Sequence, residues 1–194
     1  MKYNLEILAP SPDAWIQTVM DNFNDFLIDH AEGERKASAF ALGLVAKYPT
    51  FTKMIPALID MGVEELEHFQ QVYGLMHERG LQLPQKIKKD EYIVELTQQC
   101  RHGRMDRLMD RLIIGSMVEI RALERFKLVA DHLEDPELRR FYKKLWASEV
   151  KHGSIYIDLA AEYFPLDTIL KRAQWFFEYE AELIRRIPVR AALH

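Results

Sequence analysis

The strongest constraint on this chain is a glutamate that recurs on the apolar stripe of each long helical segment. Apolar side chains repeat at intervals of three, four or seven residues, which is the spacing of one buried face of an α-helix. Glu34, Glu65, Glu119 and Glu149 fall on the same stripes, where a helical core calls for Leu, Ile or Phe. A buried carboxylate is costly unless it is paired or bound to a metal. The fold must therefore bring these four side chains to partners.

Proline and glycine divide the chain into these helical segments, because both residues interrupt regular structure. No stretch alternates apolar and polar residues between tight turn sequences, as a half-buried strand would. We therefore predict an all-α fold with a four-helix core and additional short and C-terminal helices, formed by one domain over residues 1–194. The predicted helices cover residues 13–47, 52–79, 91–100, a long segment that ends near 133, 136–164 and 166–186.

Two of the four glutamates have a histidine three residues later, in Glu65-x-x-His68 and Glu149-x-x-His152. Residues i and i+3 lie about one turn apart on one helical face, so both side chains can reach the same metal pair. The full order of Glu, Glu-x-x-His, Glu, Glu-x-x-His is that of the di-iron and di-manganese sites of ferritin-like four-helix bundles. The six predicted metal ligands are Glu34, Glu65, His68, Glu119, Glu149 and His152.

The charge and spacing of this set agree with a metal pair. Four carboxylates balance two divalent cations, and mixed oxygen and nitrogen ligation suits iron or manganese better than calcium. Glu34 and Glu65 are 31 residues apart, and Glu119 and Glu149 are 30 residues apart, as expected for two related helical hairpins. We therefore predict a ferritin-like bundle around a buried metal site.

Helical phase separates these ligands from neighbouring polar residues. Glu32 is two residues from Glu34 and is predicted to point away from the site. His30 lies one turn before Glu34 on the same face. It is predicted to be either a supplementary metal ligand or a residue that hydrogen-bonds to a ligand. The other acidic residues that fall off the stripes, and are predicted to be exposed, are Glu64, Glu67 and Glu124.

Composition limits the partners and the compartment. The chain has 26 Lys and Arg against 30 Asp and Glu, a net charge of −4, so any nucleic-acid contact must come from a local basic patch. The single cysteine, Cys100, cannot form an internal disulfide, which fits a reducing cytoplasm. No run approaches about 18 apolar residues, and the first residues do not read as a secretory signal. We predict a cytoplasmic protein with no membrane partner.

Four stretches of the chain carry motifs that reach beyond the six predicted ligands: residues 29–37, 64–69, 119–126 and 148–152. Together they resemble the MiaE family of tRNA hydroxylases. The resemblance extends over nearly the whole chain in motif order, length and loop placement. Its most discriminating part is the string Glu-Ile-Arg-x-x-Glu-Arg-Phe, which begins at Glu119.

This resemblance implies an O2-dependent monooxygenase. Its expected substrate is the isopentenyl group of 2-methylthio-N6-isopentenyladenosine at position 37, beside the anticodon of tRNA. The resemblance also implies a centre of two iron ions held by the six ligands, with Glu65 and Glu149 as bridges and Glu34 and Glu119 as terminal ligands. No flavin or nicotinamide motif occurs in the sequence, so a separate reductase is the expected electron donor.

A stripe of arginines is the candidate surface for tRNA. Arg101, Arg104, Arg107 and Arg111 follow at intervals of three, three and four, which places them on one side of a helix. We predict that they contact phosphates of the anticodon loop. The nearby Asp106 and Asp110 leave an ordinary solvated face open as the alternative. Two further basic clusters are Lys86, Lys88 and Lys89, and Arg185, Arg186 and Arg190.

Other functions can use parts of the same pattern. A ferroxidase or iron-storage protein would use the same six ligands but require a symmetric shell, so its test is assembly size. Another di-iron oxygenase, or a manganese enzyme that decomposes peroxide, would differ in metal or in organic substrate. A non-enzymatic helical bundle would leave the glutamates on the apolar stripes without an explanation.

Overall fold

The computed structural model of this chain describes residues 3, 5–86 and 89–194, and within them it contains eight α-helices and no strand. The all-α prediction is confirmed. Lys88, of the predicted lysine cluster, lies outside the described residues. The helices are α1 (Asp13–Asp21), α2 (Phe23–Lys47), α3 (Ile55–Glu78), α4 (Glu91–Gln98), α5 (Arg104–His132), α6 (Pro136–Glu149), α7 (His152–Ala161) and α8 (Leu166–Arg186).

The chain divides into two compact units, and the division falls within α1. The first unit contains residues 1–16, 89–189 and 194, and so holds α4 to α8. The second contains residues 17–88 and 190–193, and so holds α2 and α3. Each unit is built around its own packed helices.

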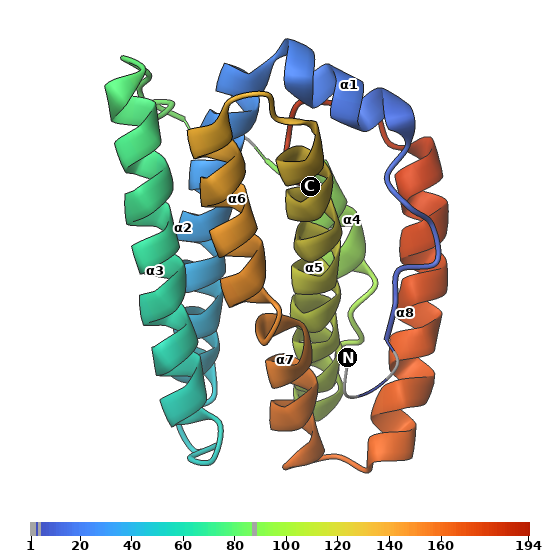
Figure 1. Cartoon of the computed structure of the whole chain (residues 1–194). Coiled ribbons are helices and arrows are strands. Elements are labelled where there is room, and N and C mark those ends of the chain that lie inside the picture. The colour runs from blue at the N-terminus through green and yellow to red at the C-terminus, as the bar shows by residue number, and fades with distance from the viewer. Residues whose placement is uncertain (1–2, 4, 87–88) are drawn as a thin grey trace. The chain divides into compact units, whose positions relative to one another are not determined.

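In the second unit, α2 and α3 pack side by side as an antiparallel hairpin (Figure 1). The Ser38 hydroxyl donates a hydrogen bond of 2.6 Å to the Gly62 carbonyl oxygen and so ties the two helices together. Gly80, just after α3, has a φ of 68°, the left-handed conformation that glycine adopts most easily after a helix. The hydrogen bond from Ser38 to Gly62 thus helps to fix which faces of α2 and α3 meet.

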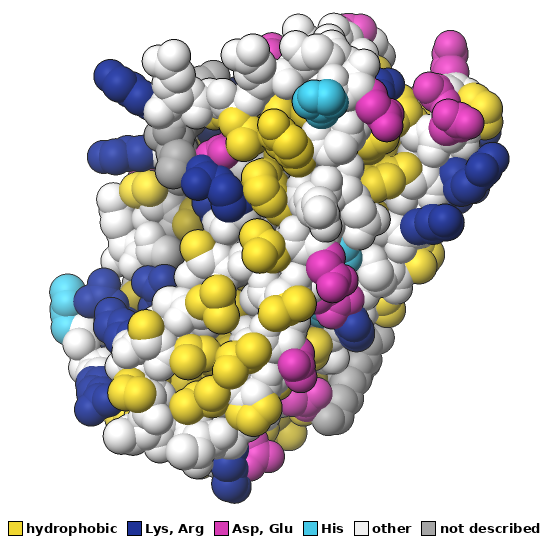
Figure 2. Space-filling view, turned by 90° about the vertical axis from the view of Figure 1, so that its left-hand side faces the viewer, with side chains coloured by type: hydrophobic (Ala, Val, Ile, Leu, Met, Phe, Trp, Pro, Cys, Tyr) yellow, Lys and Arg dark blue, Asp and Glu magenta, His cyan; other side chains and the backbone are white. Residues whose placement is uncertain are grey.

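The outer side of this hairpin carries several exposed apolar side chains. Figure 2 views the side on which α3 lies in Figure 1, and hydrophobic side chains gather on the lower part of that face. The exposed large apolar residues of the two helices are Leu42, Ile59, Val63, Leu66 and Tyr73. The glutamate-bearing stripes therefore lie on the buried sides, while these residues occupy the solvent side.

In the first unit, α6, α7 and α8 pack on α5, which is the longest helix of the chain (Figure 1). The sequence starts α6 at Asp135, whose side chain accepts hydrogen bonds from the backbone N–H groups of Glu137 and Leu138. Pro136 follows at the first helical position, where its missing N–H is not needed. The predicted start of this helix is confirmed.

Two of the predicted helices are interrupted. The segment predicted at 13–47 breaks at Asn22, which has a non-helical φ of −133° and whose side-chain amide donates to the Thr18 carbonyl. Such local bonding competes with helix continuation. The segment predicted at 136–164 breaks at Val150 and Lys151, between α6 and α7.

Among the described helices, none combines the length and the apolar character that crossing a membrane requires.

Candidate metal centre

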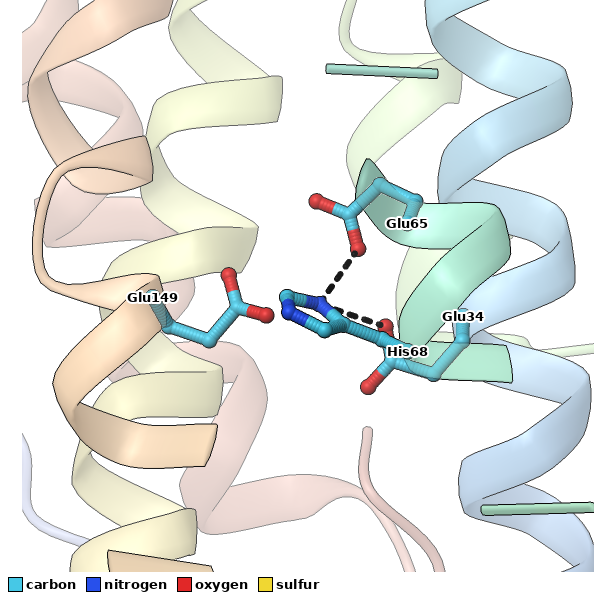
Figure 3. Close-up of side chains that lie close together, drawn as sticks. All are labelled: Glu34, Glu65, His68 and Glu149. Atoms are coloured by element: carbon cyan, nitrogen blue, oxygen red, sulfur yellow. Dashed lines mark ion pairs between the residues drawn. The ribbon is translucent and has the colours of Figure 1, made fainter. Parts of the chain in front are cut away.

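The second unit brings together three of the six predicted ligands. Glu34 comes from α2, and Glu65 and His68 come from one face of α3. All three side chains are buried. His68 Nδ1 lies 3.6 Å from Glu65 Oε2 and 4.0 Å from Glu34 Oε2, as the dashed lines of Figure 3 mark. One potential ligand atom of each residue lies within 4.8 Å of those of the other two.

His30 holds Glu34 from the same helix. Its ring is fully buried, and Nε2 lies 2.6 Å from Glu34 Oε1. Burial and the neighbouring His68 lower the pKa of His30 to about 3, so the imidazole is neutral at neutral pH. Because a carboxylate can only accept, the Nε2–H group of His30 is the donor. Of the two roles predicted for His30, the structure shows the hydrogen bond to a predicted ligand, Glu34.

The first unit brings together the other three predicted ligands. Glu119 lies on α5, Glu149 ends α6 and His152 begins α7, and all three are buried. His152 Nδ1 lies 2.5 Å from Glu149 Oε2. One potential ligand atom of each again lies within 4.8 Å of those of the other two. Each unit thus contains a buried triplet of two carboxylates and one imidazole.

The interruption between α6 and α7 falls inside the second Glu-x-x-His motif. The Ser116 hydroxyl on α5 donates a 2.5 Å hydrogen bond to the Gly153 carbonyl and fixes the first turn of α7. Tyr156 packs over Gly115 of α5, where a Cβ atom would lie 2.9 Å from the tyrosine ring. Irregular turns within a helix are often found at functional sites. The break here lies directly between the predicted ligands Glu149 and His152.

The donor chemistry of the two triplets fits a transition metal. Buried carboxylates need a compensating positive charge, and imidazole beside carboxylate is a donor set that iron and manganese accept. Hydrogen bonds that orient a ligand, such as the one from His30 to Glu34, are common around metal sites. The residues present therefore fit the metal that the sequence pattern indicates.

The predicted arginine stripe is not uniform in the structure. Arg101 precedes α5 and is held by two acids, with Nη1 2.8 Å from Asp106 Oδ1 and Nη2 2.8 Å from Asp110 Oδ1. Arg104 is exposed at the start of α5, whereas Arg107 and Arg111 are half-buried. RNA binding by this stripe stays a prediction.

Two predictions about neighbouring glutamates need correction. Glu124 was expected to be exposed, but its carboxylate is half-buried and accepts hydrogen bonds of 2.6 and 2.7 Å from the backbone N–H and the hydroxyl of Ser11. Glu64 was likewise expected to be exposed, but it is half-buried. At Glu124, the hydrogen bonds from Ser11 permit the burial that helical phase alone argues against. Glu32, which was predicted to point away from the site, belongs to neither ligand cluster; it is buried and forms a 2.7 Å ion pair with Arg35.

A buried polar network that the sequence reasoning missed surrounds Arg121. This fully buried guanidinium donates to both carboxylate oxygens of Glu180, at 2.8 and 2.9 Å, and to Glu124 and the Ala9 carbonyl. Burial raises the pKa of Glu180 although Arg121 opposes the shift. Burial, with Arg121 adding to it, also lowers the pKa of Arg125 to about 10.

The signal for part of this network is in the sequence. Arg121 and Glu124 are three residues apart, the spacing of an ion pair on one helix face. Their partners Glu180 and Ala9 are distant in the chain, so no local spacing could identify them. The discriminating string that begins at Glu119 therefore combines one metal-ligand candidate with residues that hold α5 to α8 and to the N-terminal segment.

Comparison with known proteins gives one family. Residues 2–194 match the family model described as tRNA-(MS[2]IO[6]A)-hydroxylase (MiaE). A protein named tRNA 2-(methylsulfanyl)-N(6)-isopentenyladenosine(37) hydroxylase from Pseudomonas putida is 37% identical over 177 residues, or 91% of this chain and 85% of that protein. A protein of the same name from Salmonella typhimurium is 30% identical over 225 residues, covering 91% of this chain and 82% of that protein.

A solved structure shares the fold. It is "Protein 43 with aldehyde deformylating oxygenase activity" from Synechococcus, with a TM-score of 0.92 and 31% sequence identity. The match covers 98% of this chain and 96% of that one. This likeness confirms the ferritin-like class of the predicted fold.

Proposed function

Because the chain belongs to the MiaE family of tRNA hydroxylases, we propose that it hydroxylates the isopentenyl group of 2-methylsulfanyl-N6-isopentenyladenosine at position 37 of tRNA. The observation that carries the proposal is the coincidence of this family match with two buried Glu, Glu-x-x-His triplets. A tRNA substrate is consistent with a cytoplasmic location, as the single cysteine also is.

For the cofactor, we propose two iron ions held by Glu34, Glu65, His68, Glu119, Glu149 and His152. The support is the donor chemistry of each triplet and the order of the motifs along the chain. When bound, such an iron pair supplies the reductive activation of O2, so that one oxygen atom enters a C–H bond as a hydroxyl and the other leaves as water, with two electrons and two protons consumed.

The chain itself orients the proposed metal ligands and keeps bulk water away from them. His30 orients the Glu34 carboxylate through its Nε2–H group, and Ser116 fixes the turn that begins with His152. The ligand side chains are at most 8% exposed, so bulk water is excluded from them. The sequence contains no nicotinamide or flavin motif, which supports a separate reductase as the source of electrons.

The test is the nucleoside content of tRNA from cells with and without this gene, measured by mass spectrometry in a strain shown to make the hydroxylated nucleoside. Deletion should remove the hydroxylated form and leave the isopentenylated form, lighter by one oxygen. The wild-type gene should restore it, and Glu65→Ala should not. Glu67→Ala is the matched control, because Glu67 lies on the same helix with its side chain exposed. An unchanged profile in the deletion strain would contradict the proposal.

The likeness to a protein with aldehyde deformylating oxygenase activity favours one second candidate, an oxygenase that acts on aldehydes. Incubation of the iron-loaded, reduced protein with an aldehyde and with the modified tRNA, in parallel, separates the two substrates. We expect turnover of the tRNA alone, since the family match and two relatives carry the tRNA activity in their names. The ferroxidase alternative would instead give a large symmetric shell by size-exclusion chromatography.

A further inference from the structure

The outer face of α6 carries a dense group of positive charges. Opposite the buried stripe of this helix, which is coloured orange in Figure 1, four cationic side chains project within two turns, and all four are exposed. They line a shallow surface pocket. Its lining consists of Pro136, Arg139, Arg140, Lys143, Lys144 and Ala147. We call the four cations of this face the α6 basic face.

These charges repel one another within the helix. Arg139 and Lys143 are four residues apart, as are Arg140 and Lys144, and like charges at that spacing destabilise a helix. Among the described residues, no carboxylate forms an ion pair with any of the four. A group of this kind on a chain of net charge −4 favours a polyanionic partner.

The nearest acids leave the basic face largely uncompensated. Asp131 acts on Lys143 electrostatically, but its close ion pair, at 2.8 Å, is with Lys127. Glu137 lies in the first turn of α6, where a carboxylate is favourable to the helix dipole. Arg139 donates to the Leu133 carbonyl and is therefore also a structural residue. The side chains of the remaining three cations, Arg140, Lys143 and Lys144, make no hydrogen bond or ion pair within the described part of the chain.

Two further features of α6 agree with RNA as the polyanion. Trp146 is 37% exposed beside the basic face, one turn after Lys143, and surfaces that bind RNA combine cations with aromatic side chains on which bases stack. The same helix ends in Glu149, a predicted metal ligand on its buried side. In contrast, Arg101 of the sequence-predicted stripe is already held by Asp106 and Asp110.

We propose that the α6 basic face binds the phosphate backbone of the tRNA substrate. This inference rests on the proposed function, because it assigns the surface by which that substrate is held. Phosphate contacts position an RNA without reading its bases, so the face should bind modified and unmodified anticodon arms equally.

The test is a fluorescence-anisotropy titration of an anticodon stem-loop RNA with the iron-loaded protein at several salt concentrations. The variant is Arg140→Gln with Lys143→Gln and Lys144→Gln. We expect binding to weaken about tenfold or more at 0.1 M salt, and the slope of log K against log salt to fall by about three, one for each lost phosphate contact. The iron content and melting temperature of the variant serve as checks that it remains folded.

Two control variants make the result specific. Lys47→Gln with Arg79→Gln and Lys171→Gln removes the same charge from exposed positions on other helices or their ends, and should leave the affinity within about twofold. Arg104→Ala with Arg107→Ala tests the arginine stripe independently.

Equal weakening in both triple variants would overturn the inference, because it would reflect net charge alone. If the wild-type protein binds the RNA and the α6 variant binds as tightly, the inference fails while the proposed function stands. If the wild type binds no RNA, both fail.

Discussion

Among individual residues, Asp110 is a buried charge with a full set of partners. Its side chain has no exposed surface, and it accepts hydrogen bonds from the backbone N–H and guanidinium of Arg101 and from the guanidinium of Arg172. Burial alone would raise the pKa of Asp110, but these bonds outweigh it and hold the pKa below its ordinary value. The ionised carboxylate therefore stabilises the junction of α5, α8 and the segment before α5.

Replacing this carboxylate should give a pH-dependent loss of stability. Asp110→Asn leaves two guanidinium groups without their charged acceptor, and we expect the free energy of unfolding at pH 7 to fall by about 2–3 kcal/mol. Because the folded-state pKa lies below the unfolded value of about 3.9, the stabilisation is present above that value and is lost as the pH falls through the folded pKa. Urea unfolding of both proteins at pH 7, 5, 4 and 3 measures this. A difference that does not shrink on acidification would contradict the assignment.

Individual residues were predictable where local spacing carried the information. The six candidate ligands follow from helical phase, and each lies buried within its triplet as the phase requires. The burial of Asp110 and the partial burial of Glu124 were not recognised, because their partners Arg172 and Ser11 are 62 and 113 residues away in the chain. A partner at that distance can reverse the burial that local sequence suggests.

At the scale of elements, the contact between α5 and α7 depends on one glycine. Gly115 lies within α5, and a Cβ added there would lie 2.9 Å from Tyr156 Cδ2 and 3.0 Å from two other ring atoms. An aromatic ring cannot yield as the end of a flexible chain can, so the two helices would have to separate. The close approach holds the turn that begins with His152 against α5.

Alanine substitutions at two helical glycines should therefore have opposite effects. Gly115→Ala should lower the free energy of unfolding by about 1–3 kcal/mol, because the clash exceeds the gain in helix propensity. Gly43→Ala is the control within α2, where no atom lies within 4 Å of the added Cβ, and it should raise stability by up to about 1 kcal/mol. Denaturant unfolding of the two variants gives the comparison. Stabilisation by Gly115→Ala would contradict the close packing of α5 against α7 at this position.

The existence of the helices was predictable, but their interruptions were not. Apolar periodicity continues across Asn22 and across Val150 and Lys151, so the pattern predicts unbroken helices there. The breaks depend on a side-chain hydrogen bond at Asn22 and on tertiary contacts around Gly153. The periodicity of apolar residues indicates which face of a helix is buried, but it does not indicate whether the helical backbone is continuous.

For the molecule as a whole, the sequence predicts one domain, and that stays a prediction beside the two compact units of the structure. The family match runs over residues 2–194 and therefore includes both units. Each unit supplies half of the proposed ligand set, two glutamates and one histidine. A centre that uses all six residues would require both units to be folded, which gives the proposal a thermodynamic consequence.

Iron should accordingly stabilise the entire chain. A ligand that binds only the folded state, at one hundred times its Kd, adds about 2.7 kcal/mol, which for a chain of this length raises the Tm by about 5–10 °C. We expect such a rise on adding Fe(II) to the metal-free protein without oxygen, measured by differential scanning calorimetry as one transition. Both Glu65→Ala and His152→Ala should abolish it, although they lie in different units, while Glu67→Ala should retain it. If His152→Ala kept the full rise, the proposed six-residue centre would be wrong, because the stabilising metal would then bind without the first unit's histidine.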